Sequence, residues 1–275
     1  MKFANLLSKF YCEPWCIRPD KHAAMGRLLQ DYLKSPRGFM SDPGAEPAES
    51  CEMEVHSGIA WIPIHGVLGK HLSQLEMMCG GCDYDQVAEM VEEATADPAV
   101  HTLLLDFSSP GGITTGLPEL AARLRTAAQS KQLIAWSETE CCSAAYWLAS
   151  QCHEIYCTPS ASIGCVGTYI AGIDDTRAWE MEGHKLELFR SGKLKALGME
   201  GKAWSDEDRA FLQARVDKNG VEFRAAILAN RPGIPADALE GQWFDGTDAV
   251  SNGLADATAM QFQDVIVAIL ANQPI

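Results

Sequence analysis

The stretch VHTLLLDFSSPGG (residues 100–112) decides the fold, because it joins a near-continuous apolar run to a Pro-Gly-Gly loop. An unbroken apolar run of this kind is typical of a strand covered on both faces of a parallel sheet. The preceding stretch DYDQVAEMVEEATAD (residues 83–97) repeats apolar residues at helical spacing, with Asp83 as its N-cap, and predicts a helix. Strand and helix patterns alternate from there onward. This order predicts an α/β fold with a mainly parallel sheet and βαβ crossovers.

The remaining elements follow from the same periodicities. We expect strands over 58–68, 132–137, 153–158, 164–170 and 184–190, and helices over 116–129, 143–151, 174–183 and 206–230. The long helix at 206–230 begins with Ser205 and Asp208 at capping-box spacing. Its Val221, Ala225 and Leu228 recur at i, i+4 and i+7, a pattern that suits either a partner or the core of the same chain.

The chain divides into three parts by composition. Residues 1–34 are expected to form an N-terminal helical arm, in which KHAAMGRLLQDYLK (residues 21–34) has one apolar face made of Met25, Leu28, Leu29, Tyr32 and Leu33. Residues 35–57 are rich in Pro, Gly, Ser and Glu and predict a linker. Residues 58–275 are the predicted main domain.

Composition excludes several classes of protein. The net charge of −15 argues against a nucleic-acid-binding protein, which would carry a basic surface, and against adsorption to anionic membranes. No apolar run reaches the roughly 18 residues of a membrane span, and the N-terminus lacks the apolar stretch of a signal peptide. We therefore expect a cytoplasmic protein without a membrane anchor, whose ten cysteines are mostly buried small hydrophobes.

A serine at the start of an apolar helix is the first chemical candidate. Ser143 lies in CCSAAYWLAS (residues 141–150), where its hydroxyl can project from a helix N-terminus that favours negative charge. The amide of Ala144 can donate to an oxyanion, and Gly111 and Gly112 offer further amides in a loop that a ligand can approach closely. The same residues are also explained by a helix N-cap and a plain strand-to-helix turn.

The serine hydroxyl is a weak nucleophile without a base, and a lysine is the candidate base. Lys195 lies in FRSGKLKALG (residues 189–198), with Lys193 and Lys202 as competitors. A lysine accepts a proton only when it is neutral, and partial burial favours the neutral form. A solvated loop lysine is the alternative interpretation.

The cysteines offer two further interpretations. CEPWC (residues 12–16) and CGGC (residues 79–82) contain enough thiols for a tetrahedral zinc site, but nothing in the sequence brings the two pairs together, and no metal site is predicted. Cys141 and Cys142 are alternative nucleophiles, but no histidine is placed to pair with them.

Four segments occur in an order that resembles the signal peptide peptidase A family of serine peptidases. They are LLLDFSSPGG (103–112), CCSAAYWLAS (141–150), SIGCVG (162–167) and FRSGKLK (189–195). The resemblance covers about residues 58–257. It implies the Clp-protease/crotonase fold and a Ser/Lys dyad, in which Ser143 with Tyr146 matches the nucleophile motif and Lys195, rather than Lys193, closes the Ser-Gly-x-x-Lys segment.

The match to this family departs at two positions. Ser109 to Gly112 follow the family's glycine loop, whereas Ser108 differs from its first residue. Many members have a serine that orients the lysine where this chain has Cys165, a weaker hydrogen-bonding group. The resemblance therefore implies a dyad-supporting position for Cys165.

The resemblance also implies an activity and its partners. It implies a serine endopeptidase that works through an acyl-enzyme without a cofactor, and a homo-oligomer, because single-domain members combine the serine and lysine of neighbouring protomers. The segments HAAMGRLLQDYL (22–33) and GIAWIPIHGVL (58–68) are similar to the capsid-assembly proteases of lambda-like phages and prophages. Capsid or scaffold proteins are accordingly the expected substrates, in the host cytoplasm or the procapsid, and no C-terminal scaffold extension is expected.

Three other functions remain open from the sequence. They are a cytosolic signal-peptide-peptidase-like protease of bacterial protein turnover, a crotonase-fold acyl-CoA enzyme and a non-catalytic assembly protein. Covalent labelling of Ser143 separates a peptidase from the acyl-CoA enzyme, and hydrolysis of unfolded protein excludes the assembly protein.

Overall fold

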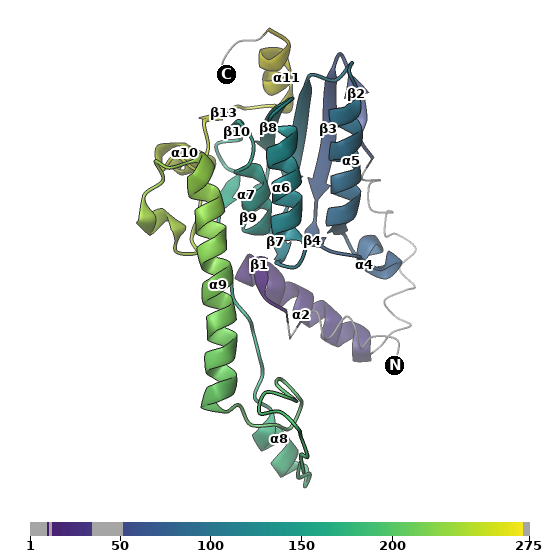
Figure 1. Ribbon diagram of the computed structural model, residues 1–275, viewed down its shortest axis with the longest axis vertical. Coiled ribbons are helices and arrows are strands. Elements are labelled where there is room, and N and C mark those ends of the chain that lie inside the picture. The colour runs from purple at the N-terminus through teal and green to yellow at the C-terminus, as the bar shows by residue number, and fades with distance from the viewer. Residues whose placement is uncertain (1–9, 11–12, 35–51, 272–275) are drawn as a thin grey trace.

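The computed structural model describes residue 10, residues 13–34 and residues 52–271. Figure 1 shows an α/β body from which the long helix α9 (Asp206–Asn230) extends to a separate projection. Shorter elements complete the chain: α4 (Gln74–Met78), α8 (Thr176–Met181), η1 (Ala236–Leu239) and α10 (Gly246–Ser251).

The body is built on a six-stranded sheet in the order β13-β10-β8-β6-β3-β2. Its strands are β2 (Glu54–His56), β3 (Ile59–His65), β6 (Thr102–Ser108), β8 (Gln132–Ser137), β10 (Glu154–Cys157) and β13 (Ala257–Thr258). Every neighbouring pair is parallel except β2 with β3. Three helices connect the central strands, namely α5 (Tyr84–Ala96), α6 (Leu117–Ala127) and α7 (Ala144–Ala149). The predicted α/β class with βαβ crossovers is confirmed.

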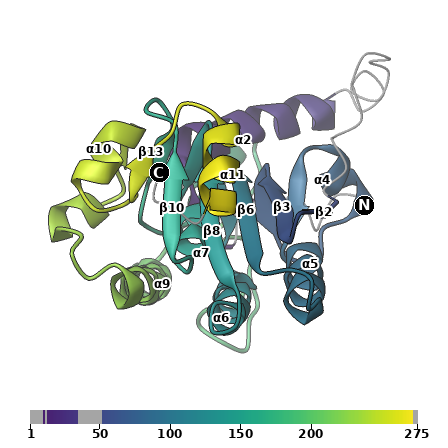
Figure 2. The same ribbon diagram turned by 90° about the horizontal axis from the view of Figure 1, so that it is seen from above.

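The sheet is covered on both faces, as Figure 2 shows with α5 and α6 on one side and α11 (Phe262–Ala271) on the other. Leu103 and Leu105 of β6 belong to the larger core, whereas Leu104 packs with Val265 of α11 in a smaller one. Successive side chains of a strand point to opposite faces. Two covered faces therefore account for the unbroken apolar run in this strand.

Two small sheets follow the carboxyl ends of the central strands. One has the order β1-β7-β4-β5 and the other β12-β11-β9. Their strands are β1 (Trp15–Ile17), β4 (Val67–Gly69), β5 (Gly81–Asp83), β7 (Gly111–Ile113), β9 (Glu140–Cys142), β11 (Ser162–Gly164) and β12 (Trp243–Phe244). Ligands of open parallel sheets bind beyond the carboxyl ends of the strands. The small sheets thus surround the place where a site is expected.

The predicted strands at 164–170 and 184–190 are wrong. The strand β11 ends at Gly164, because Gly164 and Cys165 have φ angles of 108° and 55°, which break an extended chain. Residues 184–190 form no strand, because they lie in the part of the chain at the far end of α9, where no described strand is available to pair with them. Phe189 there is 93% exposed.

The N-terminal arm contains a strand as well as a helix. The helix predicted at 21–34 is confirmed as α2 (Pro19–Lys34), which begins at a proline whose fixed φ suits the first helical position. Trp15–Ile17 form β1 and are not helical, because they pair with β7 across the body. Long-range pairing here overrides the expectation of a wholly helical arm.

The linker predicted at 35–57 is described only from residue 52 onward. Its last part includes β2, which pairs antiparallel with β3 and so extends the central sheet. The division into arm, linker and domain stays a prediction. Among the helices of the described residues, none combines the length and apolar character that a membrane crossing requires.

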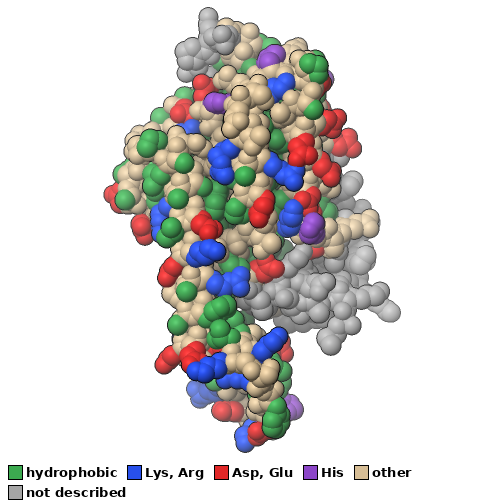
Figure 3. Space-filling model, in the orientation of Figure 1, with side chains coloured by type: hydrophobic (Ala, Val, Ile, Leu, Met, Phe, Trp, Pro, Cys, Tyr) green, Lys and Arg blue, Asp and Glu red, His purple; other side chains and the backbone are tan. Residues whose placement is uncertain are grey.

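Residues 171–205 form the projection at the far end of α9 (Figure 3). Its base is closed by two hydrogen bonds, from Trp204 Nε1 to the Ile173 carbonyl (3.3 Å) and from the Gly201 amide to Asp175 (2.8 Å). None of these residues, all of which are described, is buried. Its exposed large hydrophobic residues are Ile173, Met181, Phe189, Leu194 and Met199.

The helix α9 packs on the body through a different face from the one proposed from sequence. Phe223 is fully buried and stacks on Trp147 with ring centroids 4.7 Å apart. By contrast, Val221, Ala225 and Leu228 are exposed. Of the two interpretations of that triplet, packing into the core of the same chain is wrong.

Candidate active site

Ser143 occupies a strained turn between β9 and α7, with φ 57° and ψ −116°. A residue other than glycine in such a conformation costs about 1–3 kcal/mol and is characteristic of functional sites. Its amide donates to the Gly164 carbonyl at 2.7 Å, and its carbonyl accepts from Trp147 N at 2.9 Å. The backbone of Ser143 is therefore held at both ends while the side chain is left free.

The hydroxyl of Ser143 does not cap the helix. Ser143 is the N-cap residue of α7 by position, yet its side chain makes no capping bond. The residue is 1% exposed, and Oγ makes no hydrogen bond of normal geometry within the described residues, although the weakly polar thiol of Cys16 lies beside it. A buried hydroxyl without a partner is costly and needs an explanation. The capping explanation left open by the sequence does not supply one.

The Pro-Gly-Gly loop packs directly against Ser143. Gly111 has φ 108°, and a Cβ there would lie 3.0 Å from Ser143 Cβ and 2.1 Å from the carbonyl oxygen of Cys16. Only glycine fits between these two groups. The Gly111 amide donates to Ser109 Oγ at 3.2 Å. Of the three predicted oxyanion donors, Ala144 is therefore the best candidate in this state, since it stands in the first turn of α7, where amides lack intrahelical acceptors. The Gly112 amide faces the Cys16 carbonyl across the β1–β7 ladder.

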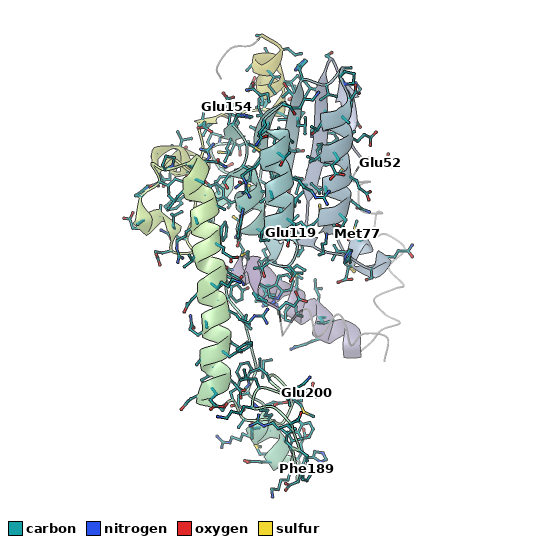
Figure 4. The ribbon with its side chains drawn as sticks, viewed as in Figure 1. Glu52, Met77, Glu119, Glu154, Phe189 and Glu200 are labelled. Atoms are coloured by element: carbon teal, nitrogen blue, oxygen red, sulfur yellow. The ribbon has the colours of Figure 1, made fainter. Side chains whose placement is uncertain are left out.

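Lys195 lies in the projection, and one chain does not bring it to Ser143. In Figure 4, Phe189 and Glu200 on either side of it in the sequence lie at the far end of the molecule from the body. The side chain of Lys195 is exposed and has no ion pair with any carboxylate in the described part of the chain. Within a single chain the serine and this lysine are separate.

The two competing lysines are engaged with carboxylates. Lys193 pairs with Glu207 at 3.0 Å on the surface, and Lys202 pairs with the buried Asp208 at the base of the projection. An ion pair holds an ammonium in its charged form. Lys195 is thus the one of the three whose amine is free of such a partner in the described residues.

Cys165 lies next to the serine through the backbone. It follows Gly164, whose carbonyl accepts the Ser143 amide, and its own amide donates to the Gln242 carbonyl at 2.8 Å. Burial raises the pKa of its thiol to about 11, so the group stays neutral. Cys165 lines a cavity of about 270 Å³ together with Ile17, Val166, Thr168, Gly220, Arg224 and Leu239.

Cys141 and Cys142, the alternative nucleophiles, are both buried beside Ser143 in the sequence. Burial raises the pKa of Cys141 and of Cys142, and the latter donates its thiol to the Ser162 carbonyl at 3.3 Å. Neither is poised as a thiolate nucleophile. No three His, Cys, Asp or Glu side chains within the described residues are grouped to hold a metal, and Cys12 lies outside those residues.

Sequence reasoning missed that the N-terminal segment reaches this site. Residues 13–18, which we call the N-terminal segment, include β1 and run along β7 beside Gly111. Arg18 at its end pairs with Glu140, three residues before Ser143, at 3.1 Å. The only sequence signal for a strand here is the short apolar run Trp15–Ile17, and three residues are too few to predict a strand.

The profile of peptidase family S49 matches residues 125–272, more than half of the chain. "Head-tail preconnector protein GP5" of Enterobacteria phage P21 is 31% identical over 205 residues, covering 74% of this chain and 41% of that protein. "Capsid assembly protease C" of Escherichia phage lambda is 28% identical over 213 residues, covering 76% of this chain and 48% of that protein. The chain spans less than half the length of these two relatives. Among solved structures, an enoyl-CoA hydratase/isomerase family member is 16% identical with a TM-score of 0.47, over 80% of this chain and 75% of that one.

Proposed function

Since the chain belongs to peptidase family S49, we propose that it is a serine endopeptidase in which Ser143 attacks the peptide carbonyl and Lys195 of a neighbouring copy accepts the serine proton. The observation that carries the proposal is the unpaired, buried Oγ of Ser143 on a strained turn. The side chain makes no capping bond to its own helix, so an incoming base would not have to break such a bond to reach the hydroxyl.

The proposed reaction follows from the groups around that hydroxyl. A neutral lysine takes the proton as Oγ bonds to the carbonyl carbon, and the oxyanion accepts hydrogen bonds from the amides of Gly112 and Ala144. The leaving amine takes the proton from the lysine, which then activates the water that hydrolyses the acyl-enzyme. No metal or organic cofactor is needed for these steps.

A lysine from a second copy would supply the base that Lys195 of the same chain, at the far end of the molecule, does not bring to Ser143. The projection carries Lys195 among exposed apolar residues that find no partner in the described chain, which favours docking on another copy. The cavity beside Cys165 supports this arrangement. Cys165 in its lining follows Gly164, whose carbonyl accepts the Ser143 amide, and the middle of α9 forms another part of its wall. We propose a homo-oligomer whose sites are completed across the subunit contacts.

The proposed substrates are proteins, with capsid or scaffold proteins of tailed phages as the first class to test. Two relatives carry the names of a capsid assembly protease and a head-tail preconnector protein. We propose that the chain acts on such proteins in the cytoplasm of an infected cell or in the procapsid.

Subunit mixing tests the shared site directly. Ser143→Ala and Lys195→Met proteins are each expected to be inactive, since each lacks one member of every dyad. After subunit exchange, about a quarter of the sites in an equal mixture would pair an intact serine with an intact lysine, and that share of activity should return. No recovery after exchange verified by mass spectrometry would place both residues in one protomer, and a monomer by light scattering would contradict the oligomer.

A further inference from the structure

The N-terminal segment lies between two backbone edges at the candidate active site. On one side β1 pairs antiparallel with β7, with Trp15 opposite Ile113 and Ile17 opposite Gly111. On the other side Trp15 and Tyr169 exchange two backbone hydrogen bonds of 2.9 and 3.0 Å. A segment of extended chain bonded on both edges is the way a peptide strand is held in a groove.

This segment covers the predicted nucleophile. The β1–β7 ladder pairs Cys16 with Gly112, and bonds from Arg18 N to Pro110 O (3.0 Å) and from Thr114 N to Pro14 O (3.2 Å) flank that pair. Hydrogen-bonded pairs alternate along an antiparallel ladder, so the Gly112 amide faces the Cys16 carbonyl. That carbonyl also lies against Gly111, which touches Ser143.

The segment therefore fills the space that a substrate would need. One of the predicted oxyanion donors, Gly112, is directed at a carbonyl of the same chain. Ser143 meanwhile is 1% exposed and can meet no solute in this state. Burial raises the pKa of the Cys16 thiol to about 12, so this side chain is a neutral small group against the serine.

Specific contacts hold the segment in place. The guanidinium of Arg18 pairs with Glu140 at 3.1 Å and lies 4.7 Å above the Trp243 ring. Trp15 is 4% exposed, and its Nε1 donates to the Phe10 carbonyl at 3.1 Å. These contacts involve residues flanking the site on both sides, and none belongs to the proposed dyad.

We propose that residues 13–18 are an intramolecular plug that occupies the groove for an extended substrate peptide and must leave before Ser143 can react. The proposal rests on the proposed function in assigning Ser143 as the nucleophile. The groove then takes a peptide strand between Gly111–Ile113 and Tyr169, with a small side chain at the Cys16 position. A tethered strand competes at an effective concentration of about 1 mM, so it lowers the rate of hydrolysis, and the activity rises when a partner or cleavage removes it.

A disulfide across the groove can lock the plug in place. Cys16 Sγ lies 3.2 Å from Thr168 Oγ1. The Trp15–Tyr169 pair exchanges both backbone bonds, so the neighbouring Cys16–Thr168 pair is the close, non-hydrogen-bonded type, with Cα atoms about 4.5 Å apart. That separation suits a disulfide, and Thr168→Cys should form one with Cys16 on mild oxidation. If no bond forms, the register is wrong and the plug is rejected.

The first readout is hydrolysis of an unfolded protein by full-length Thr168→Cys. Oxidation should lower the rate by at least about 100-fold and reduction should restore it, because a covalently held strand cannot be displaced. The matched control is Cys16→Ser/Thr168→Cys, which cannot form the bond and should respond little to oxidation. Equal rates in the oxidised and reduced forms would show that β1 is a fixed structural strand.

The second readout does not depend on catalysis. A fluorescent peptide EPWSIRPD, which is residues 13–20 with serine in place of Cys16, is added to Ser143→Ala/Thr168→Cys protein. The reduced protein should bind it and the oxidised protein should not. Binding without hydrolysis in the reduced Thr168→Cys chain would support the plug while rejecting Ser143 as nucleophile. Equal binding in both forms, or binding in neither, would overturn the plug.

Discussion

The two regions that carry the proposed dyad are opposites in packing. Around Ser143, all six residues of α7 are buried, and the serine backbone is bonded at both ends. Around Lys195, no residue of 171–205 is buried, and five of its large hydrophobic side chains are exposed. The first region is packed within one chain, whereas the second is exposed in it.

If the proposed dyad is shared between copies, this contrast gives the site one rigid half and one half that depends on assembly. A buried turn can hold a strained nucleophile because its surroundings are fixed by the sheet. An exposed projection can deliver a base only when another surface covers it, since exposed apolar patches mark interaction sites. A chain that divides its dyad in this way has little activity before it assembles, and the plug would add a second block at the serine.

Replacing the lysine of the projection should have the largest effect. Lys195→Met keeps the aliphatic stem and removes the base, and we expect kcat to fall by about 10²–10⁴-fold. Lys193→Met is the matched control two residues away. It removes a surface ion pair with Glu207, which contributes at most about 1 kcal/mol, and turnover should be near normal. Steady-state kinetics measures both variants. Loss of turnover in Lys193→Met with near-normal turnover in Lys195→Met would assign the base to Lys193.

Two phenylalanines test the packing contrast itself. Phe223→Ala removes a fully buried ring that stacks on Trp147, so the free energy of unfolding should fall by about 3–5 kcal/mol. Phe189→Ser removes a ring that is 93% exposed and should leave the melting temperature of the dissociated chain unchanged. If that ring is buried between copies, the dissociation free energy should fall by about 2 kcal/mol.

Thermal denaturation and sedimentation velocity measure the two effects separately. Phe223→Ala should lower the melting temperature, whereas Phe189→Ser should shift the oligomer to smaller species at a given concentration. An unchanged sedimentation profile for Phe189→Ser would show that this part of the projection is not an interface. If Phe189→Ser lowers the melting temperature at a protein concentration where the oligomer has dissociated, the ring packs within its own chain.

The sequence predicted those features that depend on nearby residues. Asp83 caps α5 as expected, accepting from the Asp85 amide, and the capping box of Ser205 and Asp208 begins α9. The central strands follow from apolar runs covered on both faces. These signals are local, so the residues that create them are adjacent in the chain.

The features that the sequence could not show depend on tertiary contacts. β1 is three residues long and exists only because β7 and Tyr169 bond to its two edges. The strand expected at 184–190 has the right composition but no neighbour. For Ser143, the motif identified the residue, but the positive φ and the absence of a cap bond require the fold.

The smallest expected effect concerns the base of the projection and its dependence on pH. The ion pair with Lys202 and the hydrogen bond from the Ser205 amide lower the pKa of Asp208 to about 2. A carboxylate with a lowered pKa stabilises the folded state above its ordinary pKa, and this contribution is lost as the pH falls through the folded value. The start of α9 should therefore loosen between about pH 4 and about pH 2. The exchange rate of backbone amides in peptides covering residues 199–212, divided by the rate of an unfolded reference at the same pH, would measure this loosening.

Asp208→Asn should remove this pH dependence, whereas Asp206→Asn, in the same helical turn but outside the capping box, should retain it. A wild-type response that persists in Asp208→Asn would assign the acid sensitivity to another group.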